Sequence, residues 1–164
     1  MFRVIFNDRP IAEALRQAQA TLDDMEPVFT DIGEYLVGAT KDRFAASEAP
    51  DGSKWAPKSP TTLEHYRRMG DGDRPKPLIG PSRRLSTEIH AQATKAAVEV
   101  GSNLIYSGVM QGGAAKGAFG SDGAGRPIPW GNIPARVWLG LSETDERNIL
   151  DIVDEAIAPA LDGG

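Results

Sequence analysis

The chain has 164 residues and a mass of 17.6 kDa, which suits one domain or one domain with an extended arm. It contains no cysteine, which excludes disulfides, cysteine-ligated zinc, iron–sulfur clusters and thiol catalysis. Its net charge of −5 argues against general nucleic-acid binding. We find no secretory signal and no apolar run near the ~20 residues that span a bilayer, and we expect a soluble protein made in a cytoplasm.

The charge is unevenly distributed along the chain. Residues 41–84 hold ten Lys and Arg against six Asp and Glu, a net charge of +4. The remaining residues hold eight Lys and Arg against seventeen Asp and Glu, a net charge of −9. Such asymmetry can steer one copy of a protein onto another, or onto a partner of different charge.

The N-terminal part predicts a short strand followed by a long helix. Residues 2–6 alternate apolar and polar side chains, as a half-buried strand does. From residue 11 to residue 36, apolar residues recur at spacings of four and three, which indicates one apolar helix face. We expect a helix from about Pro10 to Ala46, bent near Pro27 because proline lacks the backbone N–H. The face is typical of a core contact, and an intermolecular coiled coil is the alternative.

The middle of the chain alternates between loops and short elements. We expect extended loops at about 47–60, 70–82 and 108–131, and a short helix that starts near Ser59 and ends near Arg68. The last loop contains eight of the eighteen glycines, so we expect it to be mobile or ordered by a neighbour.

The segments between and after these loops give weaker signals. Residues 82–93 carry two apolar residues at helical spacing, 95–100 alternate like a strand, and 104–110 are apolar enough for burial. Residues 128–141 end in a β-like run. The spacing of Ser142 and Asp145 is that of a helix cap, and the helix that follows is expected to end near Pro159.

The residue types of catalysis do not gather into any recognisable motif. His65 and His90 have no paired spacing, and the phosphate-loop and GxSxG patterns are both absent. We therefore expect no enzyme activity, no cofactor and no metal. The basic doublets 67–68 and 83–84 leave a small nucleic-acid-binding protein as a further alternative.

Four segments, in order along the chain, resemble the phage virion morphogenesis family, which includes tail completion proteins of Mu-like phages and prophages. They are Phe44 with 50–57 (PDGSKWAP), Ser59 and Thr62; 78–89 (LIGPSRRLSTEI); 98–103 (VEVGSN) with Tyr106 and 111–113 (QGG); and 133–142 (IPARVWLGLS) with Asp145. Met110 stands where the family usually has histidine.

The resemblance implies a structural protein of the virion neck or tail. Such a protein assembles as a homo-oligomeric ring, usually of six copies, where the head meets the tail, and genomic DNA passes through the ring. The implied partners are further copies, the neck or connector proteins and the tail-terminator or tail-tube proteins, with no sequence-specific DNA binding and no membrane. The implied location is the virion, with the host cytoplasm during assembly. The alternative is a capsid-assembly factor that acts in head morphogenesis and is absent from the mature virion.

We expect subunit or partner contacts in the loops, because interface energy concentrates in desolvated aromatic and arginine side chains. For Trp138 a place in the core of one copy, and for Arg136 a turn-bracing role, are the alternatives. The candidate interface residues are Lys54, Trp55, Lys58, Arg83, Arg84, Tyr106, Gln111, Trp130, Arg136 and Trp138.

The expected architecture is a single α+β domain over residues 1–164. A small, mostly antiparallel sheet packs against a long kinked N-terminal helix and a C-terminal helix, with long loops rich in glycine and proline.

Overall fold

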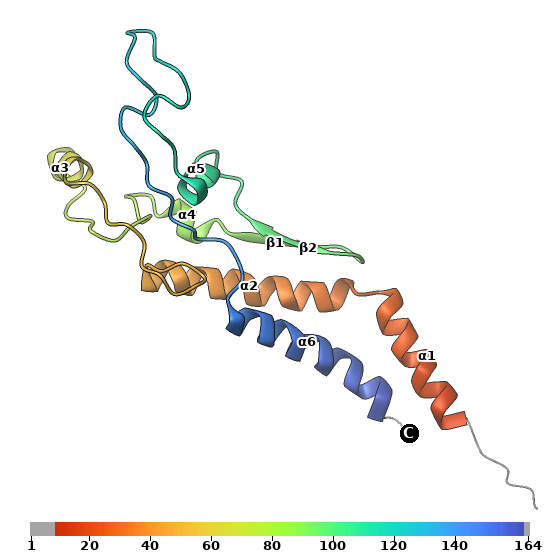
Figure 1. Ribbon diagram of the computed structural model, residues 1–164. Helices are drawn as coiled ribbons and strands as arrows, with labels where there is room; N and C mark the ends of the chain where they lie inside the picture. Colours follow the sequence, from red (N-terminus) through yellow and green to blue (C-terminus); the bar gives the residue numbers. More distant parts are fainter. Residues whose placement is uncertain (1–8, 163–164) are drawn as a thin grey trace, which may run out of the picture.

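The computed structural model describes residues 9–162, and the strand expected at 2–6 lies outside this range. The long N-terminal helix is broken in two, α1 (Arg9–Asp23) and α2 (Glu26–Ala46). Pro27 stands in the first turn of α2, where its missing N–H would have had no helical partner. The predicted bend is therefore confirmed, and α1 leaves the axis of α2 at a clear angle (Figure 1).

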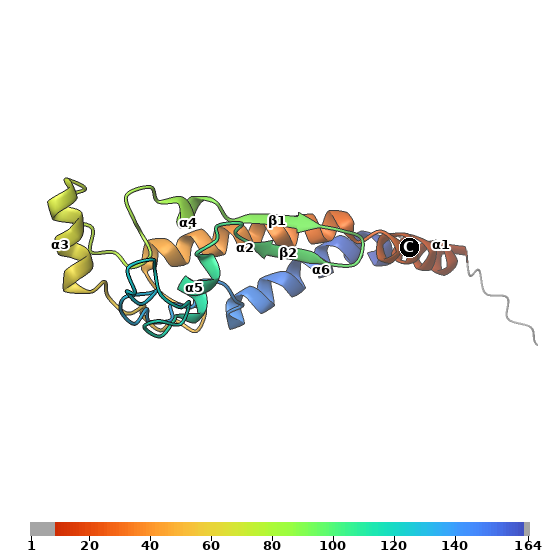
Figure 2. The ribbon, with the colours of Figure 1, turned by 90° about the horizontal axis from the view of Figure 1, so that it is seen from above.

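Helix α2 is the centre of the fold. A hairpin of β1 (His90–Ala93) and β2 (Val98–Gly101) lies on one side of it, and α6 (Glu143–Asp162) lies on the other (Figures 1 and 2). The strands are antiparallel, with His90 opposite Gly101 and Ala93 opposite Val98. Helix α1 packs against α6. This arrangement confirms the α+β class.

Three short helices complete the described chain. They are α3 (Pro60–Met69), α4 (Arg84–Thr87) and α5 (Ser107–Gly112). Helix α3 begins as predicted, because the Ser59 hydroxyl accepts a hydrogen bond from the Thr62 N–H at 3.2 Å. It lies at the end of the molecule opposite α1 (Figure 1).

The core lies between α2, α4 and the loops at this α3 end. The Phe44 ring packs on Trp55 and Trp138, with ring centroids 5.1 and 5.9 Å apart. The other buried members of the cluster are Ala49, Leu85, Ile89 and Leu104. Apolar and aromatic burial of this kind supplies most of the favourable free energy of folding.

The weaker sequence signals were partly wrong. Leu85 and Ile89 are both buried, but they do not share a helix. Leu85 lies in the one-turn helix α4, and Ile89 follows that helix, directly before strand β1. Two apolar residues four apart cannot distinguish a helix from one turn followed by a strand. The second strand begins at Val98 rather than at residue 95.

Two further expectations need correction. In 104–110 Leu104 is buried, whereas Ile105 is 98% exposed and α5 begins at Ser107. The C-terminal helix continues through Pro159 to Asp162, because a proline in its last turn removes a single helical hydrogen bond.

The β-like run before α6 forms no strand among the described residues. Its backbone is bound instead by the Gln111 side chain, whose oxygen accepts from the N–H groups of Trp138 and Leu139 at 2.9 and 3.0 Å. The Gln111 amide nitrogen donates to the Leu139 carbonyl at 2.8 Å. One side chain thus replaces the partner strand.

The glycine-rich segment forms a projecting finger, residues 113–133 (Figure 1). Its two arms are joined by backbone hydrogen bonds, including a reciprocal pair between Ala114 and Ile133 at 2.8 and 2.9 Å. Near the tip the Asp122 carboxylate accepts from the N–H groups of Ala124 and Arg126. The expectation of a loop that is mobile or ordered by a neighbour did not allow for these contacts within the chain.

Candidate assembly surfaces

Two of the three tryptophans belong to the core of a single copy. The side chains of Trp55 and Trp138 are 6% and 3% exposed. The indole N–H of Trp55 donates to the Val137 carbonyl at 2.8 Å, and that of Trp138 donates to the Ser107 carbonyl at 3.2 Å. Both aromatic groups therefore satisfy their polar atoms inside the chain.

Arg136 braces the loop that contains Trp55. Its guanidinium donates to the carbonyls of Ala56 and Pro57 at 2.7 and 2.9 Å. Burial lowers the pKa of Arg136 below its ordinary value. The residue thus ties 47–60 to 133–138, two loops far apart in sequence, as the turn-bracing interpretation proposed.

A groove runs between α3, the 70–82 loop and the base of the finger, and its volume is about 620 Å³. We call it the α3 groove. Four of the candidate interface residues line it: Lys58, Arg84, Tyr106 and Arg136. These residues are far apart in the sequence, and the fold brings them together.

Lys58 forms part of the wall of the α3 groove. Its ammonium donates to the carbonyls of Arg74 and Ile79 and lies 4.8 Å from the centre of the Tyr66 ring. Burial, followed by the charges of Arg74 and Arg136, lowers the pKa of the Lys58 ammonium. The side chain therefore fastens the 70–82 loop to the start of α3.

A second groove lies between α2, the 76–83 segment and α4, with a volume of about 530 Å³. We call it the basic groove. Lys41, Lys76 and Arg83 line it together with the apolar side chains of Phe44 and Ile79, and no acidic residue lines it. Of these residues only Arg83 was a sequence candidate.

The remaining candidates lie at or near the surface. Lys54 pairs with Glu48 at 2.9 Å and Arg84 pairs with Glu88 through a 2.5 Å contact. Trp130 is 76% exposed on the finger. Exposed Phe119 and Ile128 share the finger with it.

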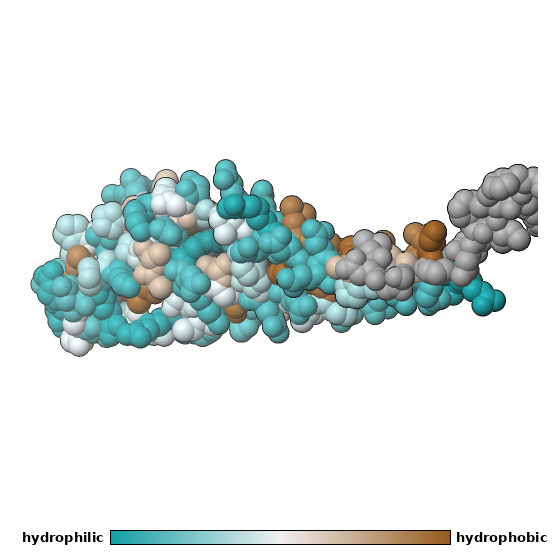
Figure 3. Space-filling model, turned by 90° about the horizontal axis from the view of Figure 1, so that it is seen from below, coloured by the Kyte–Doolittle hydropathy of each residue, from teal (hydrophilic) through white to brown (hydrophobic). Residues whose placement is uncertain are grey.

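Helix α1 presents a second exposed apolar surface, where its apolar spacing predicted a core face. Its smaller residues Ala14 and Ala18 are half-buried, whereas Ile11, Leu15 and Leu22 are each more than half exposed. Figure 3 shows hydrophobic residues at the surface of this arm. The spacing of apolar residues by four and three indicates an apolar helix face. It does not show whether that face is covered by the same chain or by another one.

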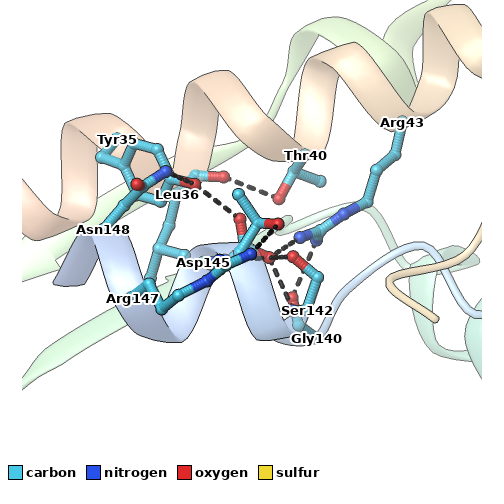
Figure 4. A network of polar contacts seen from close by, with 10 residues as sticks. Tyr35, Leu36, Thr40, Arg43, Gly140, Ser142, Asp145, Arg147 and Asn148 are labelled. Atoms are coloured by element: carbon cyan, nitrogen blue, oxygen red, sulfur yellow. Dashed lines mark hydrogen bonds and ion pairs between the residues drawn. The ribbon is translucent and has the colours of Figure 1, made fainter. Parts of the chain in front are cut away.

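A buried polar network joins α2 to α6 (Figure 4). Arg43 forms an ion pair with Asp145 and donates to the Gly140 carbonyl at 2.8 Å. The Tyr35 hydroxyl donates to the other Asp145 oxygen at 2.8 Å and accepts from Asn148 at 2.7 Å. The sequence indicated the cap of α6, but not this network.

The predicted cap of α6 is part of the same network. The Ser142 hydroxyl and N–H each donate to Asp145 at 2.7 Å, and the Asp145 N–H donates to the Ser142 hydroxyl at 3.1 Å. Burial alone would raise the pKa of the Asp145 carboxyl. The hydrogen bonds from Ser142 and Tyr35 and the charge of Arg43 outweigh burial and hold the pKa below its usual value.

Residues 9–162 contain no cluster of three or more His, Asp or Glu side chains that could hold a metal ion. Within the same range, no helix is long and apolar enough to cross a membrane.

Polar side chains brace a small core, and apolar residues are exposed on two projecting arms. The chain belongs to the phage virion morphogenesis family, whose sequence profile matches residues 6–158. It is also 27% identical over 161 residues to the "Putative capsid assembly protein G" of Escherichia phage Mu, which covers 94% of this chain and 97% of that protein. No solved structure gives a significant match.

Proposed function

We propose that this chain is a structural protein of a tailed phage or prophage that forms a ring at the head-proximal end of the tail. There it completes the tail and joins it to the head, and genomic DNA passes through its centre. Each copy acts by binding its neighbours, not by catalysis. The family membership supports a role in virion morphogenesis. The position at the head–tail junction and the ring are what we propose beyond it.

The observation that carries the proposal is the large surface that one copy exposes. It amounts to 11046 Å², whereas a compact monomer of this mass exposes about 7,900 Å². The ten residues outside the described range account for at most about 1,600 Å² of the difference. The described chain therefore carries an excess of about 1,500 Å², close to two ordinary interface patches of about 800 Å² each. A ring subunit needs two such patches, one toward each neighbour.

The positions of the exposed apolar residues fit this role. Ile11 and Leu15 on α1 and Trp130 on the finger are each more than 60% exposed. Helix α1 and the finger lie toward opposite ends of the long molecule (Figure 1). Apolar patches of this kind mark sites of association in soluble proteins. A conduit for DNA would also need a wall that does not retain it, and the net charge of −9 outside residues 41–84 permits one.

The second candidate function is that of a capsid-assembly factor that acts on heads and leaves before the virion is complete. The name of the phage Mu relative favours it. In that case the exposed arms would bind head proteins transiently.

Phage particles made without this chain distinguish the two functions. A tail-completion protein predicts DNA-filled heads and full-length tails that fail to join, seen by negative-stain electron microscopy of the lysate. Adding the purified protein to that lysate should restore joined particles. Aberrant or missing heads with normal tails would instead support the capsid-assembly factor.

A further inference from the structure

The cations of the basic groove have no acidic partner within residues 9–162. Among the described residues, Lys41, Lys76 and Arg83 form no ion pair, and Lys76 donates only to the Ala45 carbonyl at 3.1 Å. Ala45 and Ile79 give the groove an apolar floor, above the buried ring of Phe44. A ligand that fits would therefore be acidic, with an apolar side chain at its centre.

The outer face of α6 has this composition. Glu143, Glu146, Leu150 and Asp154 follow one another at spacings of three, four and four, so they share one side of the helix over roughly 16 Å. All four side chains are exposed, and Leu150 is 63% exposed. No described residue forms an ion pair with these three acids. Arg147 is the one Lys or Arg in α6.

A chain cannot bring these two surfaces of its own together. Helix α4, which borders the basic groove, lies on one side of α2, and α6 lies on the other (Figures 1 and 2). Contact between them therefore requires two copies. A contact between two different surfaces can repeat head-to-tail from copy to copy, and such a contact closes into a ring when the rotation between subunits allows it.

We infer that the basic groove of one copy receives the acidic face of α6 of the next copy, with Leu150 against the apolar floor and the acids beside Lys41, Lys76 and Arg83. The inference rests on the proposed self-assembly and adds the pair of surfaces that carries it. It also gives the charge asymmetry of the sequence a role, since all three groove cations come from the basic segment 41–84.

Charge reversal on each side tests the contact. In the groove variant Lys41→Glu is combined with Arg83→Glu, and in the helix variant Glu146→Lys is combined with Asp154→Lys. Each variant should associate at least ten-fold more weakly than the unchanged protein in sedimentation velocity at about 0.1 M salt, where attraction at this range is not fully screened. Reversing Arg67 and Arg68 to glutamate on α3 changes the net charge by the same amount as the groove variant and should leave association unchanged. Circular dichroism checks that each variant folds.

Combining the two sets of substitutions tests whether association is restored, which distinguishes this contact from a general effect of net charge. An equimolar mixture of the groove and helix variants should assemble, because each acidic groove meets a basic helix and each basic groove meets an acidic helix. The protein carrying all four substitutions should also recover association to within about three-fold. Failure of both restorations, unimpaired association of either variant, or an unchanged protein that stays monomeric at every concentration would overturn the inference. The place of the chain in the virion is decided separately by the particles made without it.

Discussion

Arg43 on α2 and Asp145 in the first turn of α6 form an ion pair across 102 residues of sequence, and both side chains are more than nine-tenths buried. Two buried charges lose their hydration, and this loss is offset only when further hydrogen bonds complete the site. Here the Arg43 guanidinium also donates a hydrogen bond to the Gly140 carbonyl. The Asp145 carboxylate also accepts hydrogen bonds from Ser142 and Tyr35. The pair therefore fixes the position of α6, including the acidic face inferred to meet the next copy.

Removing one member of this pair should be costly. Asp145→Ala leaves the Arg43 charge buried without its partner and deletes the cap of α6. We expect a loss of about 3–5 kcal/mol in the free energy of unfolding, measured by urea denaturation. Glu64→Ala, which breaks the exposed ion pair with Arg67, is the matched control and should change stability by about 0.5 kcal/mol or less. Equal effects of the two substitutions would contradict the role given to Asp145.

The same carboxyl should make stability depend on pH in the acid range. The pKa of Asp145 is lower in the folded protein than its ordinary value of 3.8, so the folded state binds fewer protons than the unfolded state. Its contribution is complete above the ordinary value and is lost as the pH falls from there through the folded-state pKa. Urea denaturation between pH 2 and pH 7 should show this loss in the unchanged protein.

Asp145→Asn is the control for the pH dependence, because the amide does not titrate. The variant should be less stable at neutral pH and should lose less stability on acidification. A weaker dependence should remain, since hydrogen bonds from Ser53, Arg84 and the Arg126 N–H lower the pKa values of Asp51, Glu88 and Asp122 respectively. Identical slopes for the variant and the unchanged protein would show that Asp145 does not titrate as described.

Two glycines in α2 provide a matched test of how the hairpin packs. A Cβ atom added at Gly33 would lie 2.8 Å from Ala91 Cβ and 3.0 Å from Val98 Cγ2, so the hairpin would have to move. Gly33→Ala should cost about 1–3 kcal/mol. Gly38→Ala meets nothing within 4 Å and should stabilise the helix by about 0.5–1 kcal/mol. Thermal unfolding followed by circular dichroism should move in opposite directions for the two variants, and a shared direction would contradict this packing.

Trp55 and Trp138 lie in the core, whereas Trp130 is exposed. Truncating a core tryptophan should lower stability, and truncating Trp130 should affect assembly instead. Trp138→Ala should cost about 3–5 kcal/mol, because it empties part of the aromatic core. Trp130→Ala should change stability by about 0.5 kcal/mol or less, since the side chain is 76% exposed. If Trp130 contacts a neighbour, its truncation should lower incorporation into particles at least several-fold. Full incorporation would remove Trp130 from the interface.

Local signals predicted the elements whose chemistry lies within a few residues. The cap at Ser142, the start of α3 at Ser59 and the break near Pro27 follow from single side chains and their neighbours in sequence. Contacts across the chain were not accessible in this way. The Gln111 side chain binds the backbone of Trp138, 27 residues along the chain, where a neighbouring strand would otherwise bind it. Arg43, which pairs with Asp145, was not among the candidate residues.

The candidate interface residues show the same division. A tryptophan or arginine beside a turn is equally suited to a core and to an interface, because both bury aromatic and guanidinium groups. Only the fold shows that Trp55, Trp138 and Arg136 already have partners in one copy, and that Trp130 is mostly exposed. The opposite error concerns α1, whose apolar spacing indicated a core face although the chain leaves its largest side chains exposed.

The measurement that tests the central claim most directly is quantitative mass spectrometry of purified, infectious virions, with the copy number of this chain referred to the tail-tube protein. A ring at the head–tail junction predicts that the chain is present at a fixed, small number of copies per particle, near six, and that it stays with the tail when heads and tails are separated. Absence of the chain from purified virions would contradict the account and leave the capsid-assembly factor in its place.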